Sequence, residues 1–395
     1  MTVIDYWAIA EAMRADLIAR RRDFHRYPEL AFEEQRTSTI IADELHKLGL
    51  EVQTGVGGTG VVGILEGASD GPTVLVRSDM DALPVFEVND VDYRSLNHGK
   101  MHACGHDGHM SILLGLAKLF SSLQSHLVGR IKFVFQPAEE IGQGAQAMVR
   151  DGVLDDPTPD IVLGLHLWTE LPIGSVGLSS GPIMAAVSNF DVHITGRGGH
   201  GGIPQDAVDP VVCAAHIITA LQTIISRNVD PLDSAVLSVT RVEAGTTHNV
   251  IPETARLSGT LRTFKAEVRN RISERIQNVC TQVALALGCE SRVEIHHKTE
   301  PVENTPHVVD RVHQAFKRIS AASLQIVDER TTAGEDVYAF MRHAPGLFFF
   351  VGAANREQGL SFPHHHEKFD FDESALPLAV ALMATAIGEY VIPQE

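Results

Sequence analysis

Short apolar segments with the length of β-strands alternate with helical segments along the first part of this 395-residue chain. The strand-like segments cover residues 60–65, 73–76, 131–135 and 160–165, and helical periodicity marks residues 5–24, 33–48, 106–122 and 142–150. This alternation is typical of α/β proteins, in which helices cover both faces of a parallel or mixed sheet. The sequence therefore predicts an α/β fold built on one large mixed sheet.

The pattern changes after about residue 185. Strand-like segments and helical segments now follow in the order βαββαβ, at residues 188–195, 210–227, 235–243, 254–262, 265–287 and 290–296. This order is that of a ferredoxin-like α+β domain. Because helices and strands resume afterwards, we expect a larger domain in two pieces, residues 1–184 and 299–395, with the smaller domain inserted at residues 185–298.

The composition excludes several classes of partner. Asp and Glu outnumber Lys and Arg by 50 to 32, which gives a formal net charge of −18. Nucleic acids and anionic membranes both favour a basic surface, so we expect neither as a partner. No continuous apolar run reaches the roughly 18 residues of a membrane span. The four cysteines lack the spacing of a disulfide framework, which favours a reducing compartment and predicts a cytoplasmic protein.

The segment MHACGHDGH, at residues 101–109, places a thiol, three imidazoles and a carboxylate next to a predicted helix. Thiolates and imidazoles are ligands of transition metals, so the segment predicts a metal site. A redox cysteine is the alternative, but no second cysteine lies close enough for a C-x-x-C pair. Spacing alone does not decide which of His102, His106 and His109 would bind a metal and which would be hydrogen-bonded structural residues.

Further polar residues follow predicted strands. Asp79 and Asp81 come after the strand at 73–76, QPAEE (136–140) comes after 131–135, and His166 comes after 160–165. Ligands of open α/β sheets bind outside the carboxyl ends of the strands, so one shared site is predicted. One glutamate of QPAEE could bind a metal while its neighbour accepts a proton from water. The alternatives are solvated surface glutamates, a turn-forming Asp81 and a core histidine at 166.

Three consecutive histidines, His364, His365 and His366, stand near the C-terminus. Neighbouring side chains of an extended segment point in opposite directions, so His364 and His366 cannot both join His365 in one site. We therefore expect one of the three positions to differ in role from its neighbours.

Taken in order, several motifs of this chain resemble those of the M20 metallopeptidase-type amidohydrolases: MHACGHDGH, QPAEE, GLHLW, GRGGHGGIPQDAVDP, THNVIPE, GTLRTF, AGEDVYAF and HHHEKFDFDE. They are most similar to the branch of hippurate hydrolases, indole-acetyl-amino acid hydrolases and bacterial N-acyl-amino acid hydrolases. The resemblance implies hydrolysis of N-acyl amino acids to a carboxylic acid and a free amino acid. A dipeptidase or carboxypeptidase of the same superfamily, or a non-catalytic metal-binding dimer, is the alternative.

The resemblance also implies two divalent metal ions, Zn²⁺ or Mn²⁺, with Co²⁺ as a further option. It implies Cys104 as the bridging thiolate, with His106, Glu140, His166 and His365 as the other metal ligands. Glu139 matches the general base, and Asp81 matches the acid that supports this base. Counting back four residues from Phe369 selects His365, and His364 and His366 are the alternatives.

The inserted domain resembles the lid of this family, which also forms its dimer interface, so a homodimer or higher homo-oligomer is implied. His200 matches a residue that reaches the active site of the partner subunit and stabilises the oxyanion. Asn249 and Arg262 match residues that hold the substrate carboxylate. Without the resemblance, the glycine-rich segment around His200 would indicate a flexible turn, and Arg262 a surface cation.

Overall fold

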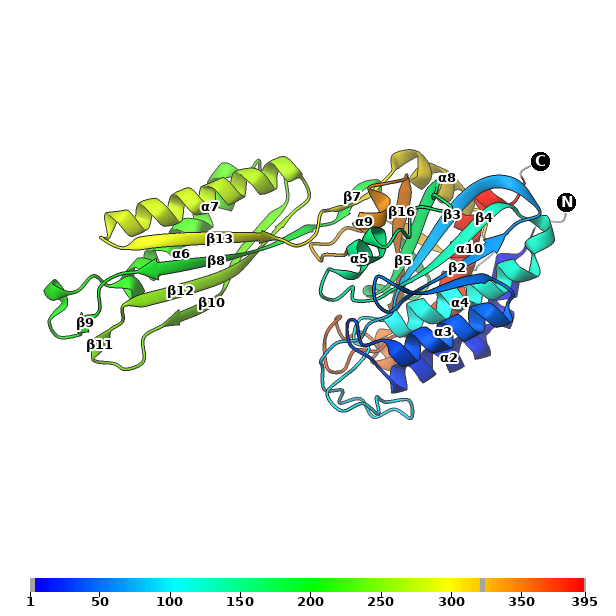
Figure 1. The fold of residues 1–395 in the computed structure, drawn as a ribbon, viewed down its shortest axis with the longest axis horizontal. Coiled ribbons are helices and arrows are strands. Elements are labelled where there is room, and N and C mark those ends of the chain that lie inside the picture. The colour runs from blue at the N-terminus through cyan, green and yellow to red at the C-terminus, as the bar shows by residue number, and fades with distance from the viewer. Residues whose placement is uncertain (1–3, 320–323, 394–395) are drawn as a thin grey trace. The chain divides into compact units, whose positions relative to one another are not determined.

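The computed structural model describes residues 4–319 and 324–393. The chain divides into two compact units. The first comprises Met1–Gly181, Glu303–Arg330 and Asp336–Glu395, and the second comprises Pro182–Val302 and Thr331–Glu335. In Figure 1 the second unit is green to yellow, whereas the first contains both the blue N-terminal part and the red C-terminal part of the chain. Short strands β7 (Gly181–Met184) and β14 (Val302–Asn304) lie where the chain passes between units.

The first unit is built on an eight-stranded sheet with the strand order β1-β2-β4-β3-β5-β16-β6-β15. The strands are β1 (Glu51–Val56), β2 (Gly60–Glu66), β3 (Ser69–Asp79), β4 (Val128–Gln136), β5 (Ile161–Pro172), β6 (Ser175–Gly177), β15 (Gln325–Val327) and β16 (Gly346–Ala354). The central strands β4, β3, β5 and β16 are parallel. Strands β1 and β2 pair with their neighbours in antiparallel orientation, and β6 is antiparallel to β16 but parallel to β15. The sheet is therefore mixed, as predicted.

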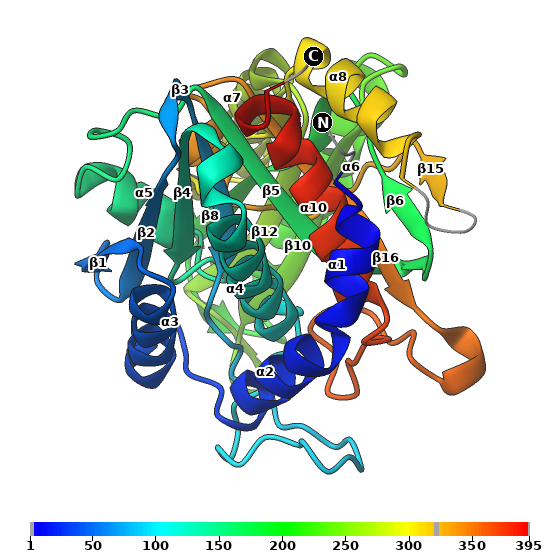
Figure 2. The same ribbon diagram turned by 90° about the vertical axis from the view of Figure 1, so that its right-hand side faces the viewer.

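Two helices pack directly on the centre of this sheet, α4 (His106–Ser122) and α10 (Ala375–Val391). The outer helices α1 (Tyr6–Ala12) and α2 (Arg14–Arg26) cover them, as Figure 2 shows. This double covering explains why α10 is apolar on nearly every side. The remaining helices of this unit are α3 (Gln35–Lys47), α5 (Gly144–Arg150), α8 (Pro306–Phe316) and α9 (Tyr338–Met341).

The N-terminal helical segment differs from its prediction. A single helix over residues 5–24 was expected, but two helices meet at Met13. Helix α1 packs against α10, whereas α2 packs against α4. The chain therefore bends because its two halves follow two different helices of the core.

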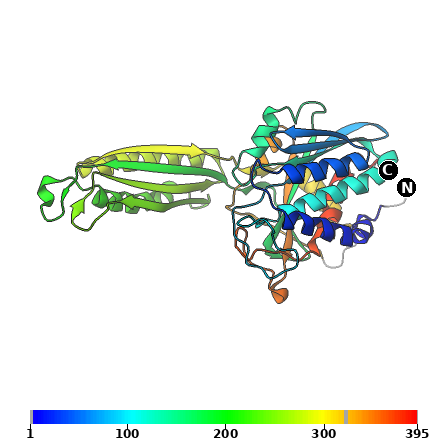
Figure 3. The same cartoon turned by 60° about the horizontal axis from the view of Figure 1, so that its bottom comes forward.

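The second unit contains a four-stranded antiparallel sheet with the order β10-β12-β8-β13. Its elements are β8 (Ala186–Thr195), β9 (Gly199–His200), α6 (Pro210–Asn228), β10 (Ala235–Ala244), β11 (Val250–Ile251), β12 (Thr254–Thr263), α7 (Ala266–Ala286) and β13 (Glu290–His297). In Figure 3 the four strands run side by side with the two long helices behind them. Phe190, Val192 and Ile194 of β8 alternate with more exposed residues and face the core. The predicted ferredoxin-like arrangement is confirmed.

Helix α6 has the length and composition of a membrane-spanning helix, with 19 residues and a mean hydropathy of 1.3. Its buried residues, among them Cys213, Ile217 and Leu221, belong to the core that it shares with α7 and the sheet. A helix with one face in the core of a folded domain can satisfy the same criteria.

Candidate metal centre and active site

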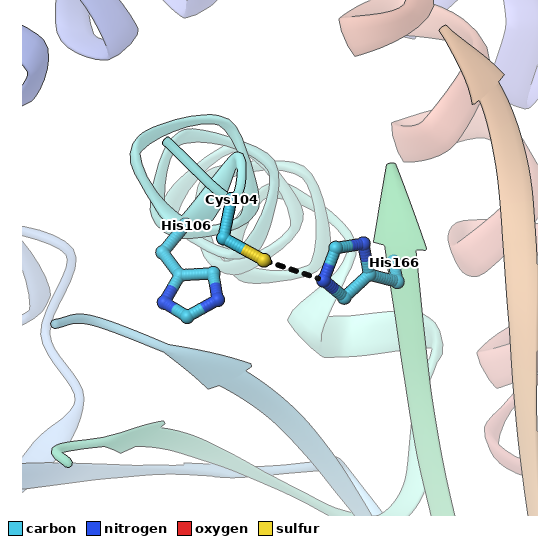
Figure 4. Close-up of side chains that lie close together, drawn as sticks. All are labelled: Cys104, His106 and His166. Atoms are coloured by element: carbon cyan, nitrogen blue, oxygen red, sulfur yellow. Dashed lines mark hydrogen bonds between the residues drawn. The ribbon is translucent and has the colours of Figure 1, made fainter. Parts of the chain in front are cut away.

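Polar side chains from several segments meet near the carboxyl ends of the central parallel strands. Cys104 Sγ lies 3.5 Å from His166 Nε2, and the two residues reach each other from the start of α4 and from β5 (Figure 4). His106, the first residue of α4, has its Nε2 3.8 Å from Glu140 Oε1. His365 Nε2 lies 3.3 Å from Glu140 Oε2. The structure therefore gathers the five sequence-predicted ligands in one place.

The local backbone places these groups. Gly105 separates Cys104 from His106 and has a φ of 94°, a left-handed conformation that glycine adopts without steric cost. The strand β5 continues to Pro172 because its later residues pair with β16, so His166 lies within the strand and not after it. Asp79 is the last residue of β3, which is also longer than predicted.

The five ligands form two groups that share the thiol. Cys104, His106 and His166 have ligand atoms within 4.8 Å of one another, and so do Cys104, Glu140 and His365. Thiolate, imidazole and carboxylate are the donors that transition metals take in proteins. The arrangement therefore supports two divalent metal ions with Cys104 between them.

The hydrogen bonds of the histidines show which ring nitrogens have a lone pair for a metal. His106 Nδ1 lies 2.8 Å from the carbonyl oxygen of Asp81, and His166 Nδ1 lies 2.7 Å from that of Leu167. A carbonyl only accepts, so both Nδ1 atoms donate, and Nε2 is in each ring the nitrogen that offers a lone pair to a metal when it is unprotonated. His106 Nε2 and Glu140 Oε1 are buried and have no hydrogen-bond partner among the described residues. These orphaned atoms fit a metal site.

His109 and His102 are arranged differently. The N–H of Leu167 donates to His109 Nε2 over 2.9 Å, and His109 Nδ1 lies 2.7 Å from Asp79 Oδ1. Both nitrogens of His109 are thereby engaged, although its ring lies within 4.8 Å of Asp79 and His106. Burial lowers the pKa of His102 to about 3, and His102 belongs to neither ligand group. The geometry thus favours His106 over His102 and His109 as a metal ligand.

The three consecutive histidines have separate surroundings. His365 joins Glu140 and has a φ of 67°, which turns its side chain away from those of its neighbours. His364 stacks on Trp168 with ring centroids 4.6 Å apart, and its Nδ1 lies 3.8 Å from Cys104 Sγ. His366 stacks on Phe362 with centroids 4.8 Å apart. Of the three positions, His365 is the one that the geometry favours as a ligand.

Asp81 holds the backbone of the two glutamates. The N–H groups of Glu139 and Glu140 each donate to one of its carboxylate oxygens, both over 3.0 Å. Glu139 Oε2 lies 4.0 Å from His106 Nε2, and the Glu139 side chain is 12% exposed. Asp81 therefore acts on the turn that carries Glu139, not on the Glu139 carboxylate itself.

The electrostatics of the site favour a cation. Burial by itself would lower the pKa of His106, but Asp79 and the other nearby carboxylates raise it to about 10. Burial raises the pKa of Glu140 to about 7. Below about pH 7 both groups therefore hold protons when no metal ion balances the carboxylates. A metal ion must displace these protons, so its affinity rises with pH.

Sequence reasoning missed the residues that support this site. Arg77, inside β3, donates to Asp79 Oδ2 and to Gln136 Oε1, both over 2.8 Å. Asp107 belongs to neither ligand group and is bonded to Arg21 at 2.8 Å and His25 at 2.7 Å. The available signal was the presence of charged residues inside predicted strands and helices of the core, where an unpaired charge is costly.

The remaining predicted residues lie in the second unit. His200 of β9 pairs with Val250 of β11, and the Gly201 N–H donates to the Asn249 carbonyl over 2.9 Å, so His200 and Asn249 are close. Arg262 lies eight residues beyond the start of β12. At roughly 3.3 Å per residue, it is about 26 Å from that end of the strand. Its guanidinium donates to Thr260 Oγ1 and Leu261 O, and no described carboxylate pairs with it.

Comparison with known proteins decides the family. The model of "Peptidase family M20/M25/M40" matches residues 75–389. The chain belongs to this family. It is 41% identical over 365 residues to N-acetyl-L-cysteine deacetylase of Bacillus subtilis, a match that covers 92% of this chain and 85% of the relative. It is 38% identical over 375 residues to thermostable carboxypeptidase 2 of Saccharolobus solfataricus, covering 93% and 94% of the two chains.

A solved structure agrees with the family assignment. The YXEP protein of Bacillus subtilis, described as a dinuclear metal binding peptidase from the M20 family, superposes with a TM-score of 0.83 at 34% identity. The match covers 95% of this chain and 98% of that protein. The M20 chain described here is a hydrolase that acts on amide bonds.

Proposed function

We propose that this M20 hydrolase cleaves the amide bond of N-acyl amino acids and releases a carboxylic acid and a free amino acid. The observation that carries this proposal is the pair of ligand groups that share Cys104, with Glu139 next to them. The acyl group is supported by a relative named N-acetyl-L-cysteine deacetylase, which is 41% identical to this chain.

Two divalent metal ions would complete the site. Cys104, His106 and His166 would hold one ion, and Cys104, Glu140 and His365 would hold the other. When bound, such ions polarise the amide carbonyl and acidify water. Thiolate and imidazole suit Zn²⁺, whereas the carboxylates also admit Mn²⁺ or Co²⁺. We propose Zn²⁺ or Mn²⁺ as the resident metal.

The reaction adds one water across the amide bond. Glu139 accepts the proton of the attacking water and delivers it to the leaving amine, so one carboxylate serves both proton transfers. Asp81 keeps Glu139 in place through the backbone N–H groups of the turn. We propose a cytoplasmic homodimer or higher homo-oligomer in which residues 185–298 form a lid and His200 stabilises the oxyanion in the active site of the partner subunit.

A screen of substrates and metals tests this proposal. The protein is stripped with a chelator, reloaded with Zn²⁺, Mn²⁺ or Co²⁺, and assayed on N-acetyl and N-benzoyl amino acids. We expect no hydrolysis by the stripped protein, two ions per chain after reloading, and hydrolysis of N-acyl amino acids. A reloaded protein that hydrolyses no amide would contradict the proposal and favour a non-catalytic metal-binding protein.

A carboxypeptidase or dipeptidase is the second candidate, because a relative at 38% identity is named thermostable carboxypeptidase 2. The two functions differ in the group on the carbonyl side of the cleaved amide, which is a simple acyl group in one case and an amino acid with a free amine in the other. Side-by-side rates on N-acetyl amino acids and on free dipeptides of the same C-terminal residue separate them. Faster cleavage of the dipeptides would select the second candidate.

We propose that Arg262 holds the substrate carboxylate, and that Asn249, which lies near His200 at the other end of β12, reaches the same carboxylate from the partner subunit. A half-buried guanidinium that forms no ion pair with any described residue suits this role, because an incoming carboxylate would supply the partner. Replacing Arg262 by Gln is expected to lower kcat/KM on N-acetyl amino acids about 10- to 100-fold, the equivalent of roughly 1.5–3 kcal/mol for a charged hydrogen bond. Steady-state kinetics provide the measurement.

The matched control for this variant is Arg256→Gln in the same strand. Arg256 already pairs with Asp191 at 2.7 Å, so its loss should leave kcat/KM nearly unchanged. Substrates whose carboxylate is replaced by an amide should show no difference between Arg262→Gln and the natural protein. Equal losses on both kinds of substrate would remove Arg262 from this role.

A further inference from the structure

The turn after β4 is held by two buried carboxylates that come from different parts of the chain. The N–H groups of Glu139 and Glu140 donate to Asp81, and the N–H of the preceding Ala138 donates to Glu34 Oε1 over 3.0 Å. Three consecutive N–H groups of the turn are thereby bound. Pro137 has no N–H, so these three are the first donors that the turn offers.

Ala138 has an unusual backbone conformation. Its φ is 53°, in the left-handed region that residues with a Cβ avoid. A residue remains in such a conformation when its surroundings hold it there. The carbonyl of Ala138 accepts the N–H groups of Gln143 and Gly144, and its N–H is bound by Glu34. The conformation of Ala138 determines the direction in which the next residue, Glu139, leaves the turn.

The side chain of Glu34 does not bind the helix that it precedes. Glu34 occupies the N-cap position of α3, but its side chain makes no capping hydrogen bond. Glu29 binds the first N–H groups of that helix instead, those of Arg36 at 3.0 Å and Thr37 at 2.8 Å. The two Glu34 oxygens are bonded to Ala138 and to the Thr59 hydroxyl.

Removing the Glu34 carboxylate from water costs free energy. The residue is 0% exposed, and no ion pair joins it to a described residue. Burial raises its pKa to about 7, and the nearby Asp81 contributes in the same direction. A carboxylate in such surroundings is stabilised mainly by the hydrogen bonds that it accepts.

We propose that Glu34 is a positioning residue for amide hydrolysis, which holds the Ala138 N–H and thereby fixes the direction of Glu139. This inference rests on the proposed function, in which Glu139 is the general base. Asp81 and Glu34 bind different parts of the turn. Asp81 binds the N–H groups of the two glutamates, and Glu34 binds the N–H of Ala138, whose conformation directs the turn.

Variants at position 34 test this role in the metal-loaded protein. We expect Glu34→Ala to lower kcat at least tenfold, with KM within threefold of the natural protein and with two metal ions per chain retained. Glu34→Gln should stay within threefold in kcat, because its amide oxygen can accept from Ala138 while its amide N–H donates to Thr59. Glu34→Leu keeps the buried volume without an acceptor and should behave like Glu34→Ala, which provides a second variant if Glu34→Ala does not fold.

Glu29→Ala is the matched control, because it removes a carboxylate that binds backbone N–H groups away from the turn. It should lower thermal stability and leave kcat within threefold. A loss of kcat in Glu29→Ala as large as in Glu34→Ala would show a general structural effect and overturn the proposal. Unchanged kcat in both Glu34→Ala and Glu34→Leu would overturn it as well.

Hydrogen exchange separates this inference from the assignment of the base. Amide exchange in a peptide that covers residues 137–141, followed by mass spectrometry, should be at least tenfold faster in Glu34→Leu and near normal in Glu34→Gln. This result does not depend on whether Glu139 is the base. Normal exchange in Glu34→Leu would disprove that Glu34 holds the Ala138 N–H. An active Glu139→Gln variant would instead disprove the proposed function and leave the exchange result intact.

Discussion

Replacing Cys104 with alanine is expected to remove both metal ions and to abolish turnover. The Cys104 sulfur belongs to both ligand groups, so its loss weakens both positions at once. Loss of an outer hydrogen-bond partner of a ligand typically costs 10–100-fold in metal affinity, and we expect more than about 100-fold for the shared ligand itself. Metal content after dialysis, measured by mass spectrometry, and turnover on an N-acetyl amino acid are the two readouts.

Cys213→Ala is the control for that variant. Cys213 is a buried thiol in the core of the second unit and takes part in neither ligand group. It should keep two metal ions per chain and normal turnover. Retention of both ions by Cys104→Ala would show that the thiol is not a ligand.

Glu139→Gln is expected to keep both metal ions and to lose turnover by about 10²- to 10⁴-fold, the usual contribution of a positioned general base. The glutamine keeps the size of the side chain and cannot accept the proton of water. The backbone bond from residue 139 to Asp81 does not involve the side chain, so the turn should remain in place. Turnover and metal content are measured on the same preparation.

The neighbouring glutamate supplies the contrast. Glu140→Gln changes a proposed ligand, so it should lower metal content first and lose turnover as a consequence. Added metal at high concentration should restore part of the activity of Glu140→Gln and none of that of Glu139→Gln. Two variants with the same behaviour would contradict the division of roles between the adjacent glutamates.

The fold was predictable where burial leaves a pattern in the sequence. Strands β3, β4 and β5 are buried on both faces, so they appear as continuous apolar segments, and the βαββαβ order of the second unit is confirmed. Strand β1 was missed because it lies at the edge of the sheet and most of its residues are exposed. An edge strand is fixed by its pairing with β2, which the sequence of β1 alone does not reveal.

The candidate site was predictable as a location, because its residues follow strands that end at one edge of the sheet. The choice among the histidines was not predictable from spacing. It depends on which ring nitrogen is already engaged, and His109 is engaged by Leu167 and Asp79 from distant segments. Glu34 was missed for a similar reason, because it falls inside the helical segment predicted over residues 33–48, whereas its partner Ala138 lies 104 residues away.

The position of β16 in the sheet has a consequence for synthesis on the ribosome. This strand lies between β5 and β6, yet it is synthesised only after Pro182–Val302, the main part of the second unit. Until then, β5 presents an unpaired, apolar edge, which is the kind of surface that associates with other chains. His365 follows β16 in the sequence, so this proposed metal ligand is synthesised after every strand of the sheet.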